Sequence, residues 1–258
     1  MSNDYMQLRL LDGKRVLVTG AAGGLGSVIC EYLAKFGAIV FLTDSDRSKL
    51  QKTYESLKKK EHDCYMKCAD LTNDEQIGEL IESLYIHTSQ LDGIVNCAGV
   101  TFPQNTEVYS DNMWEKTLKI NLTAPYKICK NIVPLMKDHG GSIINITSLN
   151  SELAFPNNPA YVASKGGLKQ LTKSLAIDLG KYNIRANNIG PGYMKTEMTK
   201  RSWSNEKIYN ERKNKTALGR WGKPEDIAGT VVFLCSNLSE YITGQDIYVD
   251  GGWLSKGL

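Results

Sequence analysis

The sequence predicts a doubly wound α/β fold in a single domain, with a parallel sheet covered by helices on both faces. Short apolar runs alternate along the 258 residues with longer amphipathic stretches. Such alternation is typical of right-handed βαβ units and a parallel sheet. The runs are apolar almost throughout, as expected of strands buried on both faces. No repeat, low-complexity tract or linker divides the chain, so one domain over 1–258 is expected.

The apolar runs give the expected elements in order. Strands are expected at 15–19, 38–43, 91–96, 142–148 and 246–250, with another just before Asp70 and a strand-like segment at 185–192. Helices are expected at 24–36, 46–60, 73–88, 111–138, 159–180 and 224–236. Within 159–180, leucines recur at spacings of three and four from Leu168 to Leu179, which predicts a core-facing stripe.

Residues 193–216 depart from the alternation of strands and helices. This long segment is polar and charged and has little apolar periodicity. Long excursions at the carboxyl edge of a parallel sheet are often active-site lids. We therefore expect a lid over the substrate at about 193–216.

Composition excludes several classes of protein. The net charge of +3 is too small to indicate a nucleic-acid-binding protein. No apolar stretch is long enough to span a membrane, and the first residues do not resemble a secretory signal. Six cysteines lie in or beside apolar segments, as buried thiols in a reducing compartment do. Cys64 and Cys68 near His62 lack a second ligand pair at zinc-like spacing. We expect a cytoplasmic protein without a metal, a membrane partner or a nucleic-acid partner.

A glycine-rich turn follows the first expected strand. The segment RVLVTGAAGGLG places Gly20, Gly24 and Gly26 between a strand and a helix. Glycines there permit a tight turn and a close approach to a pyrophosphate, and the helix N-terminus offers free N–H groups. The strand–turn–helix context favours a dinucleotide site over a simple tight turn.

The second strand ends near Asp44, 18 residues beyond Gly26. A carboxylate there can accept hydrogen bonds from both adenosine ribose hydroxyls and would repel a 2′-phosphate, which favours NAD over NADP. Arg47 is near in sequence and could attract that phosphate. The alternative interpretation of Asp44 is a helix N-cap for 46–60.

Two further turns follow expected strands. Asp70 and Leu71 are placed to hold the adenine, although Asp70 could equally cap the next helix. Asn96, Cys97, Ala98 and Gly99 follow the fourth strand. The small residues suit a close approach to the cofactor, whereas Asn96 could instead tie neighbouring strands together.

Three side chains predict the chemistry. Tyr161 and Lys165 are four residues apart at the start of a helix and so share one face. Ser148 ends the preceding strand, 13 residues before Tyr161. Strand ends and helix starts meet at the ligand-binding edge of a parallel sheet.

Oxidation of an alcohol needs a base for the hydroxyl proton as hydride leaves the carbon. A free tyrosine, with a pKa of about 10, is a poor base, but a neighbouring ammonium and a positive nicotinamide ring both favour the phenolate. We predict that Tyr161 exchanges the proton. Lys165 lowers the pKa of Tyr161 and holds the nicotinamide ribose, and Ser148 orients the substrate oxygen.

These motifs resemble the short-chain dehydrogenase/reductase family over essentially the whole chain. The glycine turn from Thr19 to Gly26, the segment from Asn96 to Gly99, and Ser148 with Tyr161-x-x-x-Lys165 match family motifs. Segments beginning at Arg220, Tyr241 and Val249 are similar to its C-terminal signature.

The resemblance implies the remaining roles. Asn121 matches the family's fourth catalytic residue, which keeps a water for proton relay beside Lys165. The strand order is then 3-2-1-4-5-6-7, in a Rossmann-type domain, and a homotetramer or homodimer forms through 111–138, 159–180 and the last strand. The cofactor contacts implied are Gly20, Gly24, Leu25, Gly26, Asp44, Asp70, Leu71, Asn96, Ala98, Gly99, Tyr161, Lys165, Pro191, Gly192, Met194 and Thr196.

The substrate is predicted only by class. Two segments are similar to gluconate 5-dehydrogenases, and the pattern is shared with 3-oxoacyl-carrier-protein reductases, which usually take NADP. Polar residues after Ser148, among them Asn150 and Glu152, suit a hydroxylated substrate, or else they satisfy loop backbone groups. We expect a sugar, sugar acid or polyol that contacts Ser148, Asn150, Glu152 and Trp203.

The lid bears on the charge of that substrate. It holds seven basic and three acidic residues, a net charge of +4, which would concentrate an anionic substrate; a solvated charged helix is the alternative. A non-catalytic NAD-binding regulator and a structural scaffold are the alternatives from other classes, and the intact catalytic set argues against both.

Overall fold

Seven strands form one parallel sheet in the order β3-β2-β1-β4-β5-β6-β7 in the computed structural model, which describes residues 9–256. The strands are β1 (Arg15–Thr19), β2 (Ile39–Asp44), β3 (Cys64–Cys68), β4 (Gly93–Asn96), β5 (Gly141–Ile146), β6 (Ile184–Pro191) and β7 (Asp246–Val249). All neighbouring pairs run parallel. The predicted fold class and strand order are therefore confirmed.

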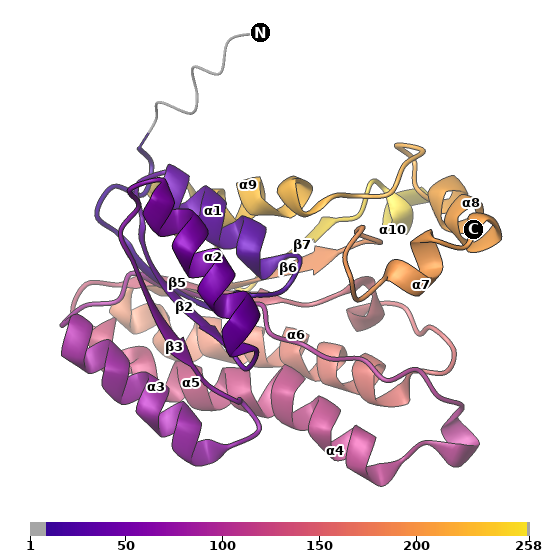
Figure 1. Ribbon diagram of the computed structural model, residues 1–258, viewed down its shortest axis with the longest axis horizontal. Helices are drawn as coiled ribbons and strands as arrows, with labels where there is room; N and C mark the ends of the chain where they lie inside the picture. Colours follow the sequence, from indigo (N-terminus) through magenta and orange to yellow (C-terminus); the bar gives the residue numbers. More distant parts are fainter. Residues whose placement is uncertain (1–8, 257–258) are drawn as a thin grey trace, which may run out of the picture.

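Helices cover both faces of the sheet (Figure 1). One face carries α1 (Gly26–Lys35), α2 (Arg47–Lys59) and α9 (Pro224–Cys235), and the other carries α3 (Asp74–His87), α4 (Asp111–Leu118), α5 (Ala124–Ile132) and α6 (Pro159–Leu179). Successive side chains of a strand point to opposite faces. Val16 and Val18 therefore join the core cluster beneath α1 and α9, whereas Leu17 joins the cluster beneath α3 and α5.

The single helix predicted over 111–138 is interrupted. A π-helical turn, Lys119–Thr123, separates α4 from α5, and a 3₁₀ turn, Val133–Leu135, follows α5. Pro125 lacks the N–H that an unbroken α-helix would donate to the carbonyl of Asn121. Periodicity cannot report this break, because the apolar stripe continues through it; isolated π turns are frequent at functional sites.

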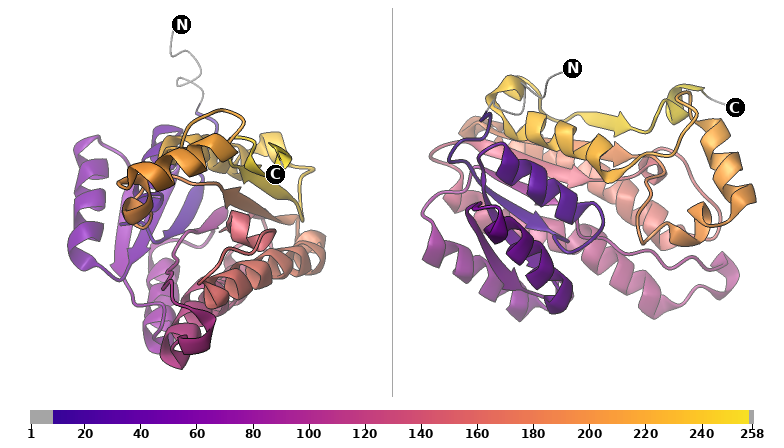
Figure 2. Two further views of the ribbon diagram at one scale, coloured as in Figure 1. Left: turned by 90° about the vertical axis from the view of Figure 1, so that its right-hand side faces the viewer. Right: turned by 45° about the horizontal axis from the view of Figure 1, so that its top comes forward.

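Residues 193–216 leave the carboxyl edge of the sheet after β6 and form two short helices, α7 (Lys200–Trp203) and α8 (Glu206–Lys215). Figure 2 shows these helices at that edge, near the short α10 (Trp253–Lys256). A sequence without apolar periodicity thus forms two short helices that have no buried residue. Within 9–256, none of the helices combines the length and apolar character that a bilayer crossing needs.

Candidate active site

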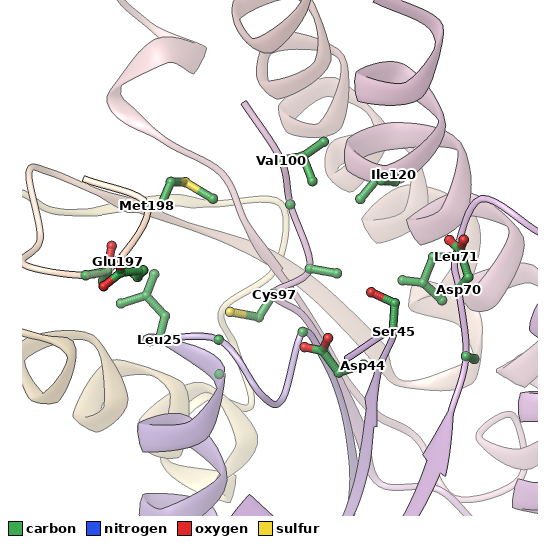
Figure 3. A pocket seen from close by; sticks show the side chains of 18 residues that line it. Leu25, Asp44, Ser45, Asp70, Leu71, Cys97, Val100, Ile120, Glu197 and Met198 are labelled. Atoms are coloured by element: carbon green, nitrogen blue, oxygen red, sulfur yellow. The ribbon is translucent and has the colours of Figure 1, made fainter. Parts of the chain in front are cut away.

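A first cavity of about 340 Å³ opens where β1, β2, β3 and β4 end. Figure 3 shows Asp44, Ser45 and Asp70 on one side of it, with Glu197 and Met198 across from them. Its lining brings together these predicted cofactor contacts: Gly20, Gly24, Leu25, Gly26, Asp44, Asp70, Leu71, Ala98, Gly99 and Thr196.

The glycine turn leaves no room for side chains at Gly20 and Gly26. Gly20 has a φ of +67°, and a Cβ on it would lie 2.7 Å from the Cα of Ala98. A Cβ on Gly26 would lie 2.0 Å from the carbonyl oxygen of Gly20. The N-terminus of α1 has no side-chain cap and no acidic residue in its first turn. Its N–H groups and partial positive charge therefore suit the pyrophosphate of a dinucleotide.

Asp44 ends β2 and lines the first cavity. Its Oδ2 accepts the N–H of Ala22 at 3.1 Å and its Oδ1 accepts the N–H of Asp46 at 3.0 Å. The N-cap of α2 is Asp46, which accepts the N–H of Lys49, so the interpretation of Asp44 as that cap is wrong. Each carboxylate oxygen keeps a second lone pair, which leaves Asp44 able to accept ribose hydroxyls. Arg47 is not among the residues that line the cavity.

Asp70 follows β3 and also lines the first cavity. Its Oδ1 accepts the N–H of Thr72 at 2.8 Å. The cap of α3 is Asn73, which accepts the N–H of Glu75. The capping alternative for Asp70 is therefore also wrong, and its carboxylate faces the cavity beside Leu71.

Asn96 lines neither cavity, contrary to its predicted cofactor contact. It is buried, and its Nδ2 donates to Oδ1 of Asn145 at 2.8 Å, which joins β4 to β5. The alternative role as a tie between strands is confirmed. The residues after it do reach the cavity, since Cys97 and Ala98 donate their N–H groups to Oγ1 of Thr19 at 3.2 and 3.1 Å.

A second cavity of about 390 Å³ adjoins the first. Leu25, Cys97, Gly99, Thr196 and Met198 line both. The second cavity brings together these other predicted residues: Ser148, Asn150, Tyr161, Lys165, Pro191, Gly192 and Met194. A molecule extended through the first cavity would therefore end beside Tyr161 and Lys165.

Tyr161 and Ser148 come from α6 and from the end of β5. Ser148 caps a 3₁₀ turn, and its Oγ accepts the N–H of Asn150 at 3.2 Å. Burial raises the pKa of Tyr161, and a hydrogen bond with Ser148 opposes this only in part. The predicted lowering of that pKa by Lys165 is not found, because desolvation of the phenol dominates in the protein alone.

Lys165 lies behind Tyr161, with Nζ 5.6 Å from the centre of the Tyr161 ring. The ammonium donates to the carbonyl oxygen of Ile146 at 2.7 Å, which fixes it at the end of β5. Burial lowers the pKa of Lys165 to about 8. The side chain therefore remains mainly cationic at neutral pH.

Asn121 lines neither cavity and is fully buried in the π-helical turn. Its Nδ2 donates to the carbonyl of Val100 at 3.0 Å and to Oγ of Ser164 at 3.1 Å, and its Oδ1 accepts the N–H of Val100. A Cβ on Gly99 would lie 3.4 Å from Asn121 Oδ1 and 3.6 Å from Lys165 Nζ. The Asn121 side chain thus supports the loop beside Lys165.

Two of the four predicted substrate contacts line the second cavity and two do not. Ser148 and Asn150 line the second cavity, whereas Glu152 and Trp203 do not. Glu152 pairs with Lys169 and accepts the hydroxyl of Tyr248 at 2.8 Å, so its carboxylate is engaged beside β7. Trp203 donates Nε1 to the carbonyl of Thr196 at 2.9 Å, which ties α7 to the cavity wall. Neither residue therefore lines the second cavity, because Glu152 is engaged by Lys169 and Tyr248 and Trp203 by the backbone of Thr196.

Several lining residues were missed by the sequence analysis. Cys97 lies within the recognised segment after β4 and could have been included; burial raises its pKa to about 12. The others belong to loops and to the segment 193–216 and carry no motif: Ser45, Glu197, Met198, Phe155, Asn158, Tyr193 and Arg212. Within the described residues, no three His, Cys, Asp or Glu side chains form a metal-binding group.

This arrangement can exchange a proton with a bound oxygen. A phenol, a serine hydroxyl and an ammonium converge where the glycine-lined cavity meets the second one. They would surround the carbon atom at which an alcohol is oxidised or a ketone reduced.

Comparisons with known proteins all match oxidoreductases over nearly the whole chain. The profile of the family described as enoyl-(acyl carrier protein) reductase matches residues 20–254. A 5-keto-D-gluconate 5-reductase of Escherichia coli is 31% identical, with 95% of this chain and 96% of the relative covered. A 3-oxoacyl-[acyl-carrier-protein] reductase of Aquifex aeolicus is 35% identical over 94% of this chain and 98% of the relative.

A solved structure matches equally well along its length. The gluconate 5-dehydrogenase of Burkholderia cenocepacia, in complex with NADP and tartrate, superposes with a TM-score of 0.92. It is 29% identical and covers 97% of this chain and 98% of its own. Relatives of this kind interconvert secondary alcohols and ketones.

Proposed function

The chain belongs to the short-chain dehydrogenase/reductase family, and we propose that it transfers hydride between NAD(H) and a secondary alcohol or ketone of a sugar acid. Membership of the family makes it an oxidoreductase that acts on CH–OH groups with a nicotinamide cofactor. One observation carries the proposal: Ser148, Tyr161 and Lys165 line a cavity that adjoins the glycine-lined one.

The cofactor, when bound, supplies the acceptor or donor of hydride. The residues that would hold it are those of the glycine turn, Asp44 and Asp70 in the first cavity, Thr196 in both, and Pro191, Gly192 and Met194 in the second. The open N-terminus of α1 supports this fit.

Tyr161 would take the hydroxyl proton during oxidation and return it during reduction. Because burial raises its pKa, its phenolate would need positive charge in the complete complex. Lys165 supplies one such charge from 5.6 Å behind the ring. Ser148 would donate to the substrate oxygen and hold it near Tyr161, as an oxyanion-binding group does. Asn121 would act by positioning, since it holds the loop beside Lys165.

We propose NAD as the preferred nicotinamide cofactor. Asp44 offers a carboxylate at the position expected for the ribose hydroxyls and would repel a 2′-phosphate. Arg47, the basic residue nearest to Asp44 in the sequence, does not line the first cavity. The Burkholderia relative, in contrast, was solved with NADP.

The sugar-acid class is supported by the relatives that act on 5-keto-D-gluconate and gluconate and by polar side chains in the second cavity. Reduction of a 3-oxoacyl thioester is the second candidate, favoured by the 35% identity to the Aquifex reductase. The other features proposed are a homotetramer or homodimer, a cytoplasmic location consistent with six free cysteines, and a substrate lid formed by 193–216.

Absorbance at the reduced-nicotinamide band tests the proposal. Purified protein is offered 5-keto-D-gluconate with NADH or NADPH, D-gluconate with either oxidised cofactor, and a 3-oxoacyl thioester as the competitor. Turnover of the sugar acid, faster with NAD(H), is the expected result. Turnover confined to the thioester would replace the sugar-acid proposal with the second candidate, and failure with every alcohol and ketone would refute the function.

A further inference from the structure

Arg212 of α8 is the one lid cation that lines the second cavity. Lys195 instead lies over the ring of Tyr209, at 5.0 Å from its centre, and Arg201 lines a separate surface cavity beside Phe102. The basic character of 193–216 therefore reaches the reaction site through a single guanidinium.

The guanidinium of Arg212 is held without being neutralised. Its Cζ lies 3.8 Å from the centre of the Tyr193 ring, a cation–π distance at which the planar group rests on the ring face. Tyr193 is fixed in turn by edge contacts with Trp221 and Phe155 at 5.4 and 6.0 Å. An aromatic platform thus sets the position of the cation before any substrate arrives.

The same guanidinium lacks a polar partner among residues 9–256. Its Nε is buried without a hydrogen bond, and no carboxylate in that part of the chain forms an ion pair with it. Buried polar groups are nearly always satisfied, whereas the Nε of this half-buried side chain is not. The unused donors therefore indicate a ligand acceptor.

Two other residues that line the second cavity each carry a buried polar atom without a partner. Nδ2 of Asn150 and Oδ1 of Asn158 are buried without a partner, while the opposite ends of these amides are bonded to Ser148 and Thr101. Of six such atoms in the described part of the chain, three therefore belong to residues of the second cavity. One donor and one acceptor beside a cation match a hydroxylated anion.

The charges that line the second cavity also favour an anionic ligand. Its lining contains Lys165 and Arg212 but neither aspartate nor glutamate, so nothing in the wall would repel an anion. Lys165 donates to the carbonyl of Ile146 and lies beside the ring of Tyr161, at the reacting end of the cavity. The guanidinium of Arg212 remains as the group that can take a carboxylate through paired N–H donors.

We propose that Arg212 binds the carboxylate of a polyhydroxylated acid substrate and that Asn150 and Asn158 bind its hydroxyl groups. This inference rests on the proposed function and specifies its substrate. The lid would then select acids through the guanidinium of Arg212, which rests on the ring face of Tyr193. Ser148 and Tyr161 would hold the reacting oxygen.

The test compares two substrates that differ at C1. D-Gluconate carries a carboxylate there and D-sorbitol a hydroxymethyl group, with the remaining carbons alike. We expect Arg212→Gln to lower kcat/KM for D-gluconate by about 100-fold, equivalent to about 2.8 kcal/mol at 1.4 kcal/mol per tenfold. The value for D-sorbitol should change by less than about threefold, because a neutral group forms no charge-assisted bond.

Lys207→Gln is the matched control, since it removes a positive charge from an exposed residue of the same helix. It should leave the ratio of kcat/KM for D-gluconate to kcat/KM for D-sorbitol unchanged. NADH affinity should be unchanged in both variants. An unchanged gluconate-to-sorbitol ratio in Arg212→Gln would overturn the inference. An equal loss in Lys207→Gln would also overturn it, because the general charge of the lid would then be responsible.

A binding measurement separates this inference from the proposed function. Calorimetric titration of D-gluconate into the protein–NADH complex needs no turnover. Binding that is lost in Arg212→Gln, without turnover by the unmodified protein, would support the anion site and refute the proposed reaction. Turnover with binding independent of Arg212 would support the reaction and refute the anion site.

Discussion

The first and second cavities share five lining residues but are built by different means. The first is formed mainly by the turns that directly follow β1, β2, β3 and β4, with Thr196, Glu197 and Met198 opposite them. The second is formed by the ends of β5 and β6, the start of α6, and loops that include 193–216. Most of the first cavity is thus set by strand ends, whereas the second depends more on irregular segments.

The two cavities also differ in how far their polar side chains are hydrogen-bonded. In the first cavity Asp44 accepts two backbone N–H groups and Asp70 accepts one, and no polar side-chain atom of its lining residues is buried without a partner. The second holds Asn150, Asn158 and Arg212 with unpaired atoms. Unpaired polar groups lower stability and favour a ligand that satisfies them. The comparison therefore predicts that changes in the two cavities will affect separate measurements.

Tyr161→Phe should give the largest effect. Removal of the proton-transferring hydroxyl is expected to lower kcat by about 10³-fold, within the usual range for general acid–base groups. NADH affinity, measured by fluorescence titration, should remain within about twofold because the glycine turn is untouched. Tyr85→Phe on the exposed face of α3 is the control. Retention of more than a tenth of the rate in Tyr161→Phe would remove Tyr161 from the mechanism.

Asp44→Ala tests the first cavity alone. Loss of hydrogen bonds to a charged group should lower the NAD-to-NADP preference in kcat/KM by about 10- to 100-fold. The preference between D-gluconate and D-sorbitol should not change. Asp46→Ala removes the neighbouring carboxylate, which caps α2, and should reduce stability by about 1 kcal/mol without altering the cofactor ratio. A ratio unaffected by Asp44→Ala would contradict the proposed ribose contact.

The pH dependence of ketone reduction tests the junction of the cavities. Lys165 has a pKa of about 8 because of burial, so its ammonium is present below that pH and lost above it. Tyr161, whose pKa is raised, keeps its proton through this range. We expect kcat/KM for reduction to be level below pH 8 and to fall by about tenfold per pH unit well above it. A rise above pH 8 would show that the ammonium is not required.

Trp203→Phe should give the smallest effect. It removes one hydrogen bond, from Nε1 to the carbonyl of Thr196, while keeping an aromatic ring in α7. Since Thr196 lines both cavities, the KM values for cofactor and substrate should both rise by about fivefold, which corresponds to a net hydrogen bond of about 1 kcal/mol. Steady-state kinetics with each varied in turn gives both values. A rise in only one of them would assign α7 to that cavity alone.

The first cavity could be predicted well from the sequence because its residues follow strands. A glycine turn and the carboxylate at the end of β2 lie next to one another in space whenever the strands are parallel neighbours. Asn96 was misplaced for a local reason: it is the last residue of β4, and its side chain turns into the sheet towards Asn145 rather than into the cavity.

The second cavity could be predicted only in part. Ser148 and Tyr161 carry a recognisable spacing, but Glu152 and Trp203 are held by Lys169 and Thr196, partners that only the folded chain brings near. Arg212 could be identified as basic, yet its place on Tyr193 depends on how α8 packs. Nor could periodicity reveal the π-helical turn that holds Asn121, because the break arises from Pro125 within a continuous apolar pattern.

The central claim is that hydride passes directly from a substrate carbon in the second cavity to a cofactor lying in the first. Mass spectrometry of the reduced cofactor, formed from D-gluconate deuterated at C5, tests it. The account predicts one deuterium in the NADH produced, with none released to water. Unlabelled NADH with deuterium in the solvent would contradict direct transfer, and with it the assignment of the two cavities.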